Sequence, residues 1–258
     1  YSGFAGTAVA AGQNIVLKDA GGATLATAAI ESIDTNTVII DGKATGFIKP
    51  LSRAKKTVTA VGNAQVSTGT PIKFGTGIGL FDGTGDRFSL TSASDFGFGT
   101  GDFSVEGVIY ISDDTGTEMM FDFRAGSATD NALNFYTVDR VPKINIGTTS
   151  IMAPAITLIN TTFYHIMISR VGTTIKFFVD GVQQATASNN TNLGTTKPLI
   201  IGSDYAGVNG FAGRIDDFRV RKGAGQASAF TNPTSASIVD QYTVLKLDFD
   251  EDSGSQVL

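Results

Sequence analysis

IKFFVDGVQQATA, residues 175–187, consists of two β-type segments joined by a tight turn at Asp180-Gly181. A two-residue hairpin turn needs positive φ at its central residues, which Asp-Gly adopts readily. LFDGTGDRFSL (80–90) and GFAGRIDDFRV (210–220) are similar, with a glycine turn at one end or in the middle of a β segment. These three stretches predict strands connected by tight turns, and the rest of the chain is interpreted outward from them.

Further strand signals follow one another at short intervals. FSVEGVIYI (103–111) alternates so that Phe103, Val105 and Ile109 share one face, as in a half-buried strand. GQASAF (225–230) is the one segment that resembles a short helix. Regular strands separated by turn residues predict an all-β, antiparallel β-sandwich. The other strand-like segments are TVTAVGNAQVS (57–67), EMMFDFRA (118–125), ALNFYTV (132–138), KINIG (143–147), FYHIMISRV (163–171), PLIIG (198–202) and TVLKLDFDE (243–251).

The composition is consistent with one large β domain and a smaller appendage. The 258 residues are 41% hydrophobic and 17% charged, and they include 31 glycines but only 6 prolines. Such a chain can bury a sizeable core and can form many tight turns. It has no cysteine, which excludes disulfides and thiolate metal sites. It also has no tryptophan, so a sugar-stacking site would have to use the 6 tyrosines or 18 phenylalanines.

The net charge argues against nucleic acid as a partner, and the lack of a long apolar run argues against membrane insertion. The net charge is −5, which opposes non-specific binding to a phosphate backbone. Residues 1–70 carry a net charge of +2 and the remainder a net charge of −7. The small basic excess at Lys49, Arg53, Lys55 and Lys56 is interpreted as a solvated linker. No apolar run approaches the ~20 residues that cross a bilayer, so membrane insertion is not expected.

Residues 1–52 are predicted to form a small β region, separate from residues 53–258. Gly21-Gly22 and Asp41-Gly42 lie between strand-like segments and are typical of hairpin turns. A region this short buries too little surface to be stable alone. It is therefore expected to pack against the larger domain, a neighbouring subunit or another protein.

Six short motifs occur in a characteristic order within residues 57–251. They are FDGTGD (81–86), TGDFSVEG (100–107), FYHIMISR (163–170), FFVDG (177–181), LIIG (199–202) and GRIDDFRV (213–220). Their order and spacing resemble the concanavalin A-like, laminin-G-type jelly roll of phage virion structural proteins. Two departures from the family remove large aromatic side chains. Gly107-Val108 stands where an aromatic-rich strand is usual, and Phe163-Tyr164 replaces the usual tryptophan.

The resemblance implies a jelly roll at residues 53–258 and a non-catalytic role on the virion surface, outside the cell. Such a protein would decorate a capsid or form part of a fibre or tail. Residues 1–52 would attach it to other virion proteins or to copies of itself, in a homo-oligomer such as a trimer. The jelly roll would stabilise the particle or adhere to a host-surface glycan. The alternative is a secreted bacterial lectin-like module that binds glycans.

The sequence predicts that the protein is not an enzyme. A glycosidase needs two carboxylates flanking the scissile bond, but glutamate occurs only at positions 31, 106, 118 and 251. Asp216 and Asp217 are adjacent, so a regular strand would direct them to opposite faces. The one histidine, His165, lies within a strand-like segment and is expected to be a surface or hydrogen-bonded residue.

Calcium is the ligand that the resemblance favours. Related jelly rolls often hold one structural Ca²⁺ where the first strands meet the strand that matches GRIDDFRV. The resemblance assigns Asp217 as a calcium ligand and Asp82 as a nearby partner, because hard cations prefer oxygen ligands. The alternative is that both carboxylates cap turns or form salt bridges. No other cofactor is predicted.

Overall fold

The computed structural model divides into two compact units, residues 1–53 and residues 54–258. It describes residues 14–18, 24–34, 37–40, 56–112 and 115–250. The described part of the first unit is an antiparallel sheet in the order β1 (Asn14–Lys18), β2 (Thr24–Asp34) and β3 (Thr37–Ile40). No helix in the described ranges has the length and apolarity to cross a membrane.

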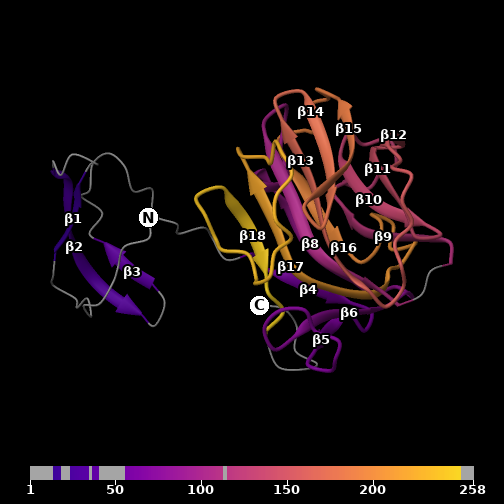
Figure 1. The fold of residues 1–258 in the computed structure, drawn as a ribbon, viewed down its shortest axis with the longest axis horizontal. Helices are drawn as coiled ribbons and strands as arrows, with labels where there is room; N and C mark the ends of the chain where they lie inside the picture. Colours follow the sequence, from indigo (N-terminus) through magenta and orange to yellow (C-terminus); the bar gives the residue numbers. More distant parts are fainter. Residues whose placement is uncertain (1–13, 19–23, 35–36, 41–55, 113–114, 251–258) are drawn as a thin grey trace. The chain divides into compact units, whose positions relative to one another are not determined.

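The larger unit is a sandwich of two antiparallel sheets, drawn as two layers in Figure 1. The seven-stranded sheet has the order β12 (Thr149–Met152), β11 (Val141–Ile146), β10 (Leu133–Val138), β9 (Thr117–Asp122), β16 (Lys197–Ile201), β7 (Arg87–Ala93), β4 (Val58–Val61). The eight-stranded sheet has the order β15 (Val182–Ser188), β14 (Thr174–Val179), β13 (Phe163–Val171), β8 (Phe103–Ile111), β17 (Ala212–Lys222), β6 (Ile78–Asp82), β5 (Gln65–Ser67), with β18 (Thr243–Leu247) paired to β17. The predicted all-β, antiparallel jelly-roll sandwich is confirmed.

The local patterns of the sequence account for these strands. The alternation in β8 buries Phe103, Val105 and Ile109 in the core between the sheets. Asp180 and Gly181 have φ of 50° and 79°, so the β14–β15 turn has the positive φ that its sequence predicts. The segment 225–230 is not helical as expected, because neighbouring strands bind its backbone. Its Gln226 N–H donates to Ser169 Oγ, and the N–H of Phe230 donates to the Gly181 carbonyl.

Phenylalanine side chains join the two sheets. The ring of Phe135 on β10 lies 5.5 Å, between centroids, from that of Phe177 on β14. The ring of Phe121 on β9 lies 5.9 Å from that of Phe218 on β17. All four are almost fully buried, and full burial of a side chain of this size stabilises a fold by ~1.5–3 kcal/mol. The phenylalanines therefore fill the core of a chain that has no tryptophan.

One arginine lies fully inside this structure. The guanidinium of Arg170, at the end of β13, donates to the carbonyls of Gly99, Gly101 and Thr191 over 2.6–3.0 Å. It also lies 5.0 Å from the ring centroid of Phe103. Desolvation lowers the pKa of Arg170 from its usual value. Arg170 thus holds two loops at the end of the sandwich through carbonyl oxygens rather than through a carboxylate.

A β-bulge interrupts β17 at the two adjacent aspartates. The pairing of β17 with β8 shifts register between Asp216 and Arg219, and Asp217 has a φ of 47°. Asp216 accepts a hydrogen bond from the N–H of Phe74, whereas Asp217 contacts Lys246. Both carboxylates therefore lie on the outer face of the sheet. The expectation that they face opposite sides is wrong, because the bulge breaks the period of two.

Candidate functional site

A pocket of about 370 Å³ opens at the end of β6 and β17. Asp82 and Ala212 are register partners on these strands, and they form part of its wall. The segment before β9, the first two residues of β9 and the β16–β17 loop complete it. The lining consists of Asp82, Gly83, Thr84, Thr115, Thr117, Glu118, Asn209, Gly210 and Ala212. The groups that face a ligand here are therefore carboxylate, hydroxyl and amide groups.

Hydrogen bonds hold the carboxylate of Asp82 in place within this pocket. Its Oδ1 accepts a hydrogen bond from the N–H of Thr84 at 2.7 Å, and its Oδ2 accepts one from Asn63 Nδ2 at 3.0 Å. These bonds, with that from Thr84 first, lower the pKa of Asp82. A carboxylate with a lowered pKa suits the acceptance of hydrogen bonds and not proton donation as a general acid.

A buried aspartate, Asp204, holds the loop that brings Asn209 and Gly210 to the pocket. Asp204 accepts hydrogen bonds from the N–H groups of Ala206 and Val208 and from Asn209 Nδ2, at 2.9–3.0 Å. The carbonyl of Asn209 in turn accepts a hydrogen bond from Met119 N–H at 2.8 Å. The loop is therefore shaped by its own hydrogen bonds before any ligand arrives.

Glu118 is a pocket residue that the motifs of the sequence did not single out. It is buried, and its Oε1 accepts a hydrogen bond from the N–H of Ala212 at 3.0 Å. It thereby connects the start of β9 to the start of β17. No local pattern marks it as a site residue, because Glu118 and Asp82 come together only through the packing of the two sheets.

Asp217, the expected calcium ligand, lies elsewhere on the sheet. Its carboxylate accepts hydrogen bonds from the N–H and the hydroxyl of Ser237, and it lies 3.3 Å from Lys246 Nζ. Asp82 pairs with Ala212, five residues before Asp217 along β17, which is about 17 Å of strand. The structure therefore does not bring Asp82 near Asp217, and that part of the expectation is wrong.

The contacts of both aspartates match the alternative interpretation, a turn for Asp82 and a salt bridge for Asp217. Within the described ranges, no group of three or more His, Cys, Asp or Glu side chains is arranged to hold a metal. Calcium binding at Asp217 or at Asp82 stays a prediction. Because the two residues lie apart, each position would need its own further ligands.

His165 belongs to a buried polar group on the outer face of the eight-stranded sheet. Its Nε2 lies 3.2 Å from Glu106 Oε2, and Arg219 Nε donates to Glu106 Oε1 at 2.7 Å. Burial raises the pKa of Glu106, but the hydrogen bond from His165 and the charge of Arg219 outweigh it and hold that pKa below its usual value. His165 is thus a hydrogen-bonded strand residue, as expected.

The fold and its motifs match one family model. The model describes concanavalin A-like lectins and glucanases, and it matches residues 82–228, more than half of the chain. The chain belongs to the concanavalin A-like lectin/glucanase superfamily. The matched range starts at the pocket residue Asp82 and includes every other residue of the pocket.

Solved structures with this superfamily fold include domain 4 of AbnA, an extracellular arabinanase of Geobacillus stearothermophilus, in complex with arabinotriose. The TM-score is 0.50 at 17% identity, over 66% of this chain and 84% of that one. For a putative carbohydrate binding protein from Bacteroides ovatus the TM-score is 0.46 at 14% identity, over 87% of this chain and 58% of that one. A Trypanosoma rangeli sialidase mutant gives 0.48 at 15% identity, over 60% and 26%.

At these identities the likeness concerns the fold alone. The chain spans less than two thirds of the length of the sialidase and of the Bacteroides protein. A comparison with curated proteins found no significant match. The superfamily fold is thus established, and the function has to be argued from the chain's own residues.

Proposed function

We propose that the larger unit is a non-catalytic glycan-binding module that binds sugar hydroxyls in the pocket beside Asp82. The observation that carries this proposal is the polar, prearranged pocket in a domain of the concanavalin A-like superfamily. Asp82 would accept hydrogen bonds from a pair of hydroxyls, and Thr84, Thr117 and Asn209 would complete the contacts. The arabinotriose complex of a domain with this fold supports the same class of ligand.

The chemistry of the lining predicts weak binding at a single site. A hydrogen bond that replaces bonds to water contributes ~0.5–1.5 kcal/mol. Three or four such bonds give about 4 kcal/mol, which corresponds to a Kd near 1 mM. Display of several copies on one particle would raise the avidity by ~100-fold or more without any new contact. Weak single sites therefore fit a protein that acts in many copies.

A glycan array followed by calorimetry tests this function. The double variant Thr84→Ala/Thr117→Ala removes two exposed pocket hydroxyls, and Thr148→Ala/Thr149→Ala removes two exposed hydroxyls at the β12 edge of the seven-stranded sheet, away from the pocket. We expect the pocket variant to weaken glycan binding at least fivefold and the second variant to leave it unchanged. A chain that binds no oligosaccharide, or one that cleaves the bound oligosaccharide, would contradict the proposal.

We further propose that the module acts on the surface of a phage virion, as a capsid decoration or as a component of a fibre or tail. The support is the order of the six motifs and a separate first unit, whose described residues form a three-stranded sheet. In this setting residues 1–52 attach the protein to other virion proteins or to its own copies. The module then stabilises the particle or adheres to a host glycan.

Particles assembled with a chain that lacks residues 1–52 test this setting. We expect the shortened chain to be absent from purified particles, whereas the full chain is incorporated. Normal incorporation of the shortened chain would contradict the attachment role. Secretion of the full chain by a bacterium that carries no phage would favour the alternative, a secreted glycan-binding module.

A further inference from the structure

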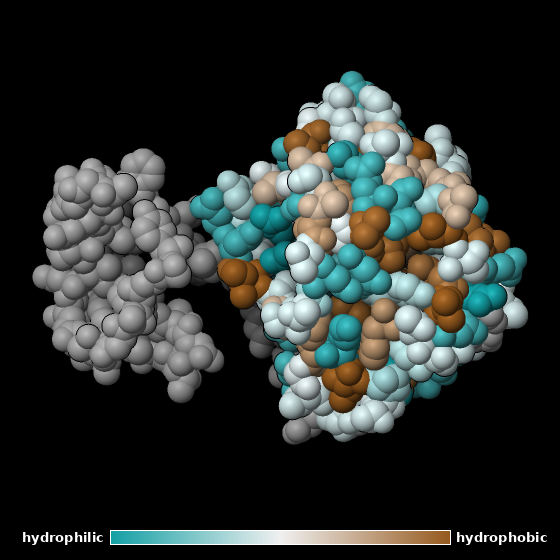
Figure 2. Space-filling model, viewed as in Figure 1, coloured by the Kyte–Doolittle hydropathy of each residue, from teal (hydrophilic) through white to brown (hydrophobic). Residues whose placement is uncertain are grey.

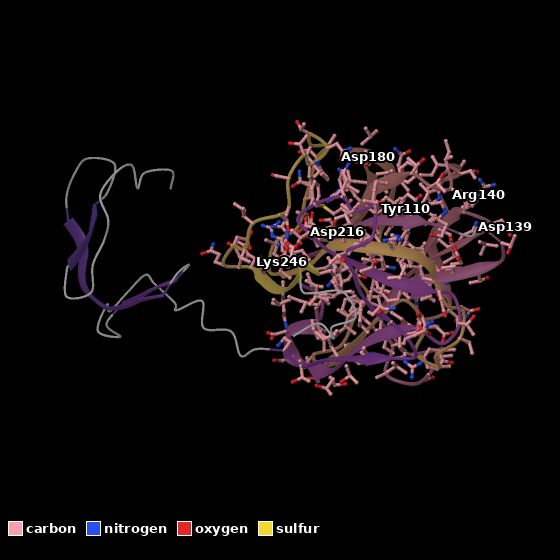
Figure 3. The ribbon with its side chains drawn as sticks, turned by 90° about the horizontal axis from the view of Figure 1, so that it is seen from below. Tyr110, Asp139, Arg140, Asp180, Asp216 and Lys246 are labelled. Carbon is pink, nitrogen blue, oxygen red and sulfur yellow. The ribbon has the colours of Figure 1, made fainter. Side chains whose placement is uncertain are left out.

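A row of half-buried side chains crosses the outer face of the eight-stranded sheet. Leu80, Arg214, Tyr110 and Phe163 are neighbours in register on β6, β17, β8 and β13. The next row on the same face, with Val108 at its centre, is buried. The first row is thus a shelf that remains accessible at one end of an otherwise covered face. Figure 3 labels Tyr110 and also Asp216, which follows the register partner of Tyr110, Arg214, by two residues on β17.

Two aromatic rings and an ammonium group meet on this shelf. The ring centroids of Tyr110 and Phe163 are 5.0 Å apart, with the planes tilted by 52°. Lys73 Nζ lies 5.8 Å from the centroid of Phe163 and 5.8 Å from that of Phe74. Lys73 is exposed and forms no ion pair with any carboxylate in the described ranges. The shelf therefore offers aromatic surface with an accessible positive charge at its edge.

The loop that carries this lysine is held by three side chains, two from β17 and one from the segment after β18. Arg214 Nη1 donates to the carbonyl of Gly69 at 2.6 Å. Asp216 Oδ2 accepts a hydrogen bond from the N–H of Phe74 at 2.9 Å, and Asp250 Oδ1 accepts one from the N–H of Thr76 at 2.7 Å. The loop is thereby held at three points along its length, and Lys73 is positioned over the rings.

The charges of the shelf select the ligand class. Lys73 and Arg214 bring two cationic groups to this surface, and the carboxylates of the neighbouring Asp216 and Asp250 accept hydrogen bonds from backbone N–H groups of the loop. Aromatic rings pack against the apolar face of a pyranose, and an ammonium group attracts a carboxylate. A sugar that carries a carboxylate can contact both the aromatic rings and the ammonium group, whereas a neutral sugar would contact only the rings.

The shelf and the pocket lie close together on the same strands. Leu80 and Arg214 pair two residues away from Asp82 and Ala212, which is about 7 Å along the strands. Tyr110 and Phe163 lie one and two strands beyond Arg214, about 5 and 10 Å across the sheet. A bound chain of two or three sugar units can therefore extend from one to the other. We propose that Lys73, Tyr110 and Phe163 form a second subsite, which binds a carboxylated sugar unit of the glycan that the pocket holds. This inference rests on the proposed glycan-binding function and gives that function its ligand class, an acidic oligosaccharide.

Calorimetry with paired ligands tests the subsite in the full chain. The pairs are trigalacturonic acid with galactotriose, and 3′-sialyllactose with lactose. We expect at least one acidic ligand to bind tenfold more tightly than its neutral partner in low salt. Lys73→Gln should abolish that preference and leave the neutral affinity unchanged. Tyr110→Leu, which keeps an apolar side chain, should weaken the acidic ligand at least threefold. Lys143→Gln, on the other sheet, is the control and should change neither affinity.

The outcomes separate this inference from the proposed function. Neutral binding that depends on Thr84 and Thr117, without preference for either acidic ligand, would overturn the subsite and leave the glycan module intact. Acidic binding that depends on Lys73 but not on the pocket threonines would overturn the pocket. A polyglutamate peptide that binds as tightly as the acidic sugars, and with the same dependence on Lys73, would overturn the assignment to a sugar.

Discussion

Ser237 donates both its backbone N–H and its hydroxyl to the carboxylate of Asp217, each over 2.8 Å. The segment between β17 and β18 is thereby fastened to the bulge in β17. Lys246 on β18 approaches the same carboxylate, and Arg219 on β17 donates to the carbonyl of Ile238. These contacts are polar and lie on the outer face. Hydrogen bonds and an ion pair, and not a second hydrophobic core, therefore hold the segment there.

Asp217→Ala should lower the free energy of unfolding by about 1–3 kcal/mol, because it leaves two half-buried donors of Ser237 without a charged acceptor. Urea unfolding at pH 7 measures this change. The same variant tests the expected calcium ligand: a rise in Tm on addition of Ca²⁺ that occurs in the wild type and is lost in Asp217→Ala would confirm it. An unchanged Tm in the wild type would contradict calcium binding there.

Arg170→Met should destabilise the larger unit by about 3 kcal/mol or more. The change removes a fully buried guanidinium and leaves the carbonyls of Gly99, Gly101 and Thr191 without their donor. Urea unfolding followed by far-ultraviolet circular dichroism measures the loss. Lys143→Gln, a half-buried position without such contacts in the described structure, should change stability by less than about 0.5 kcal/mol. Equal effects in the two variants would show that Arg170 does not support the loops.

Gly181→Ala and Gly172→Ala separate backbone strain from a steric clash. Both glycines have positive φ, 79° and 59°, so each alanine carries a similar conformational cost of ~1 kcal/mol. A Cβ at position 181 would lie 2.0 Å from the carbonyl oxygen of Phe230, whereas a Cβ at position 172 would meet nothing within 4 Å. Gly181→Ala should therefore be the more destabilising in thermal unfolding. Similar Tm values would contradict the packing of the 225–242 segment on this hairpin.

Asp216 should make stability depend on pH. Burial is the main cause that raises its pKa to about 6, so the folded state holds a proton more tightly than the unfolded state. Its favourable contribution is fully present below about pH 4 and is lost as pH rises through 6. The loss is at most about 3 kcal/mol. Relative to Asp216→Asn, the wild type should become less stable between pH 4 and pH 7, as measured by urea unfolding. Parallel pH profiles would contradict a raised pKa.

The strands were predictable where their side chains alternate and where turns have a marked composition. FSVEGVIYI and the Asp180-Gly181 turn show this, because each depends on neighbours in the chain. The bulge at Asp216 was not predictable, since it depends on how β17 pairs with β8. The helix expected at residues 225–230 failed for the same reason, because Ser169 and Gly181 bind its backbone.

The candidate site could likewise be predicted from the sequence only in part. Asp82 could be singled out from its motif, but its partners Thr117, Glu118 and Asn209 come from segments that the fold brings together. Asp217, which the resemblance places near Asp82, lies on β17 five residues from Ala212, the register partner of Asp82. On the face shown in Figure 2, hydrophobic residues are scattered among hydrophilic ones rather than gathered in one patch. No composition rule would therefore have located a binding surface there.

The hydrogen bond between Thr76 and Asp250 joins residues that are 174 positions apart. During synthesis, most of the domain is added between Lys73 and Asp250. The carboxylate of Asp250, which helps to hold the loop of Lys73, is therefore added late. Nascent or prematurely terminated chains therefore lack a finished shelf, even when their earlier hairpins have formed. The proposed subsite would then be complete only in chains that extend to Asp250, and an acidic-sugar affinity column would separate these chains from shorter ones.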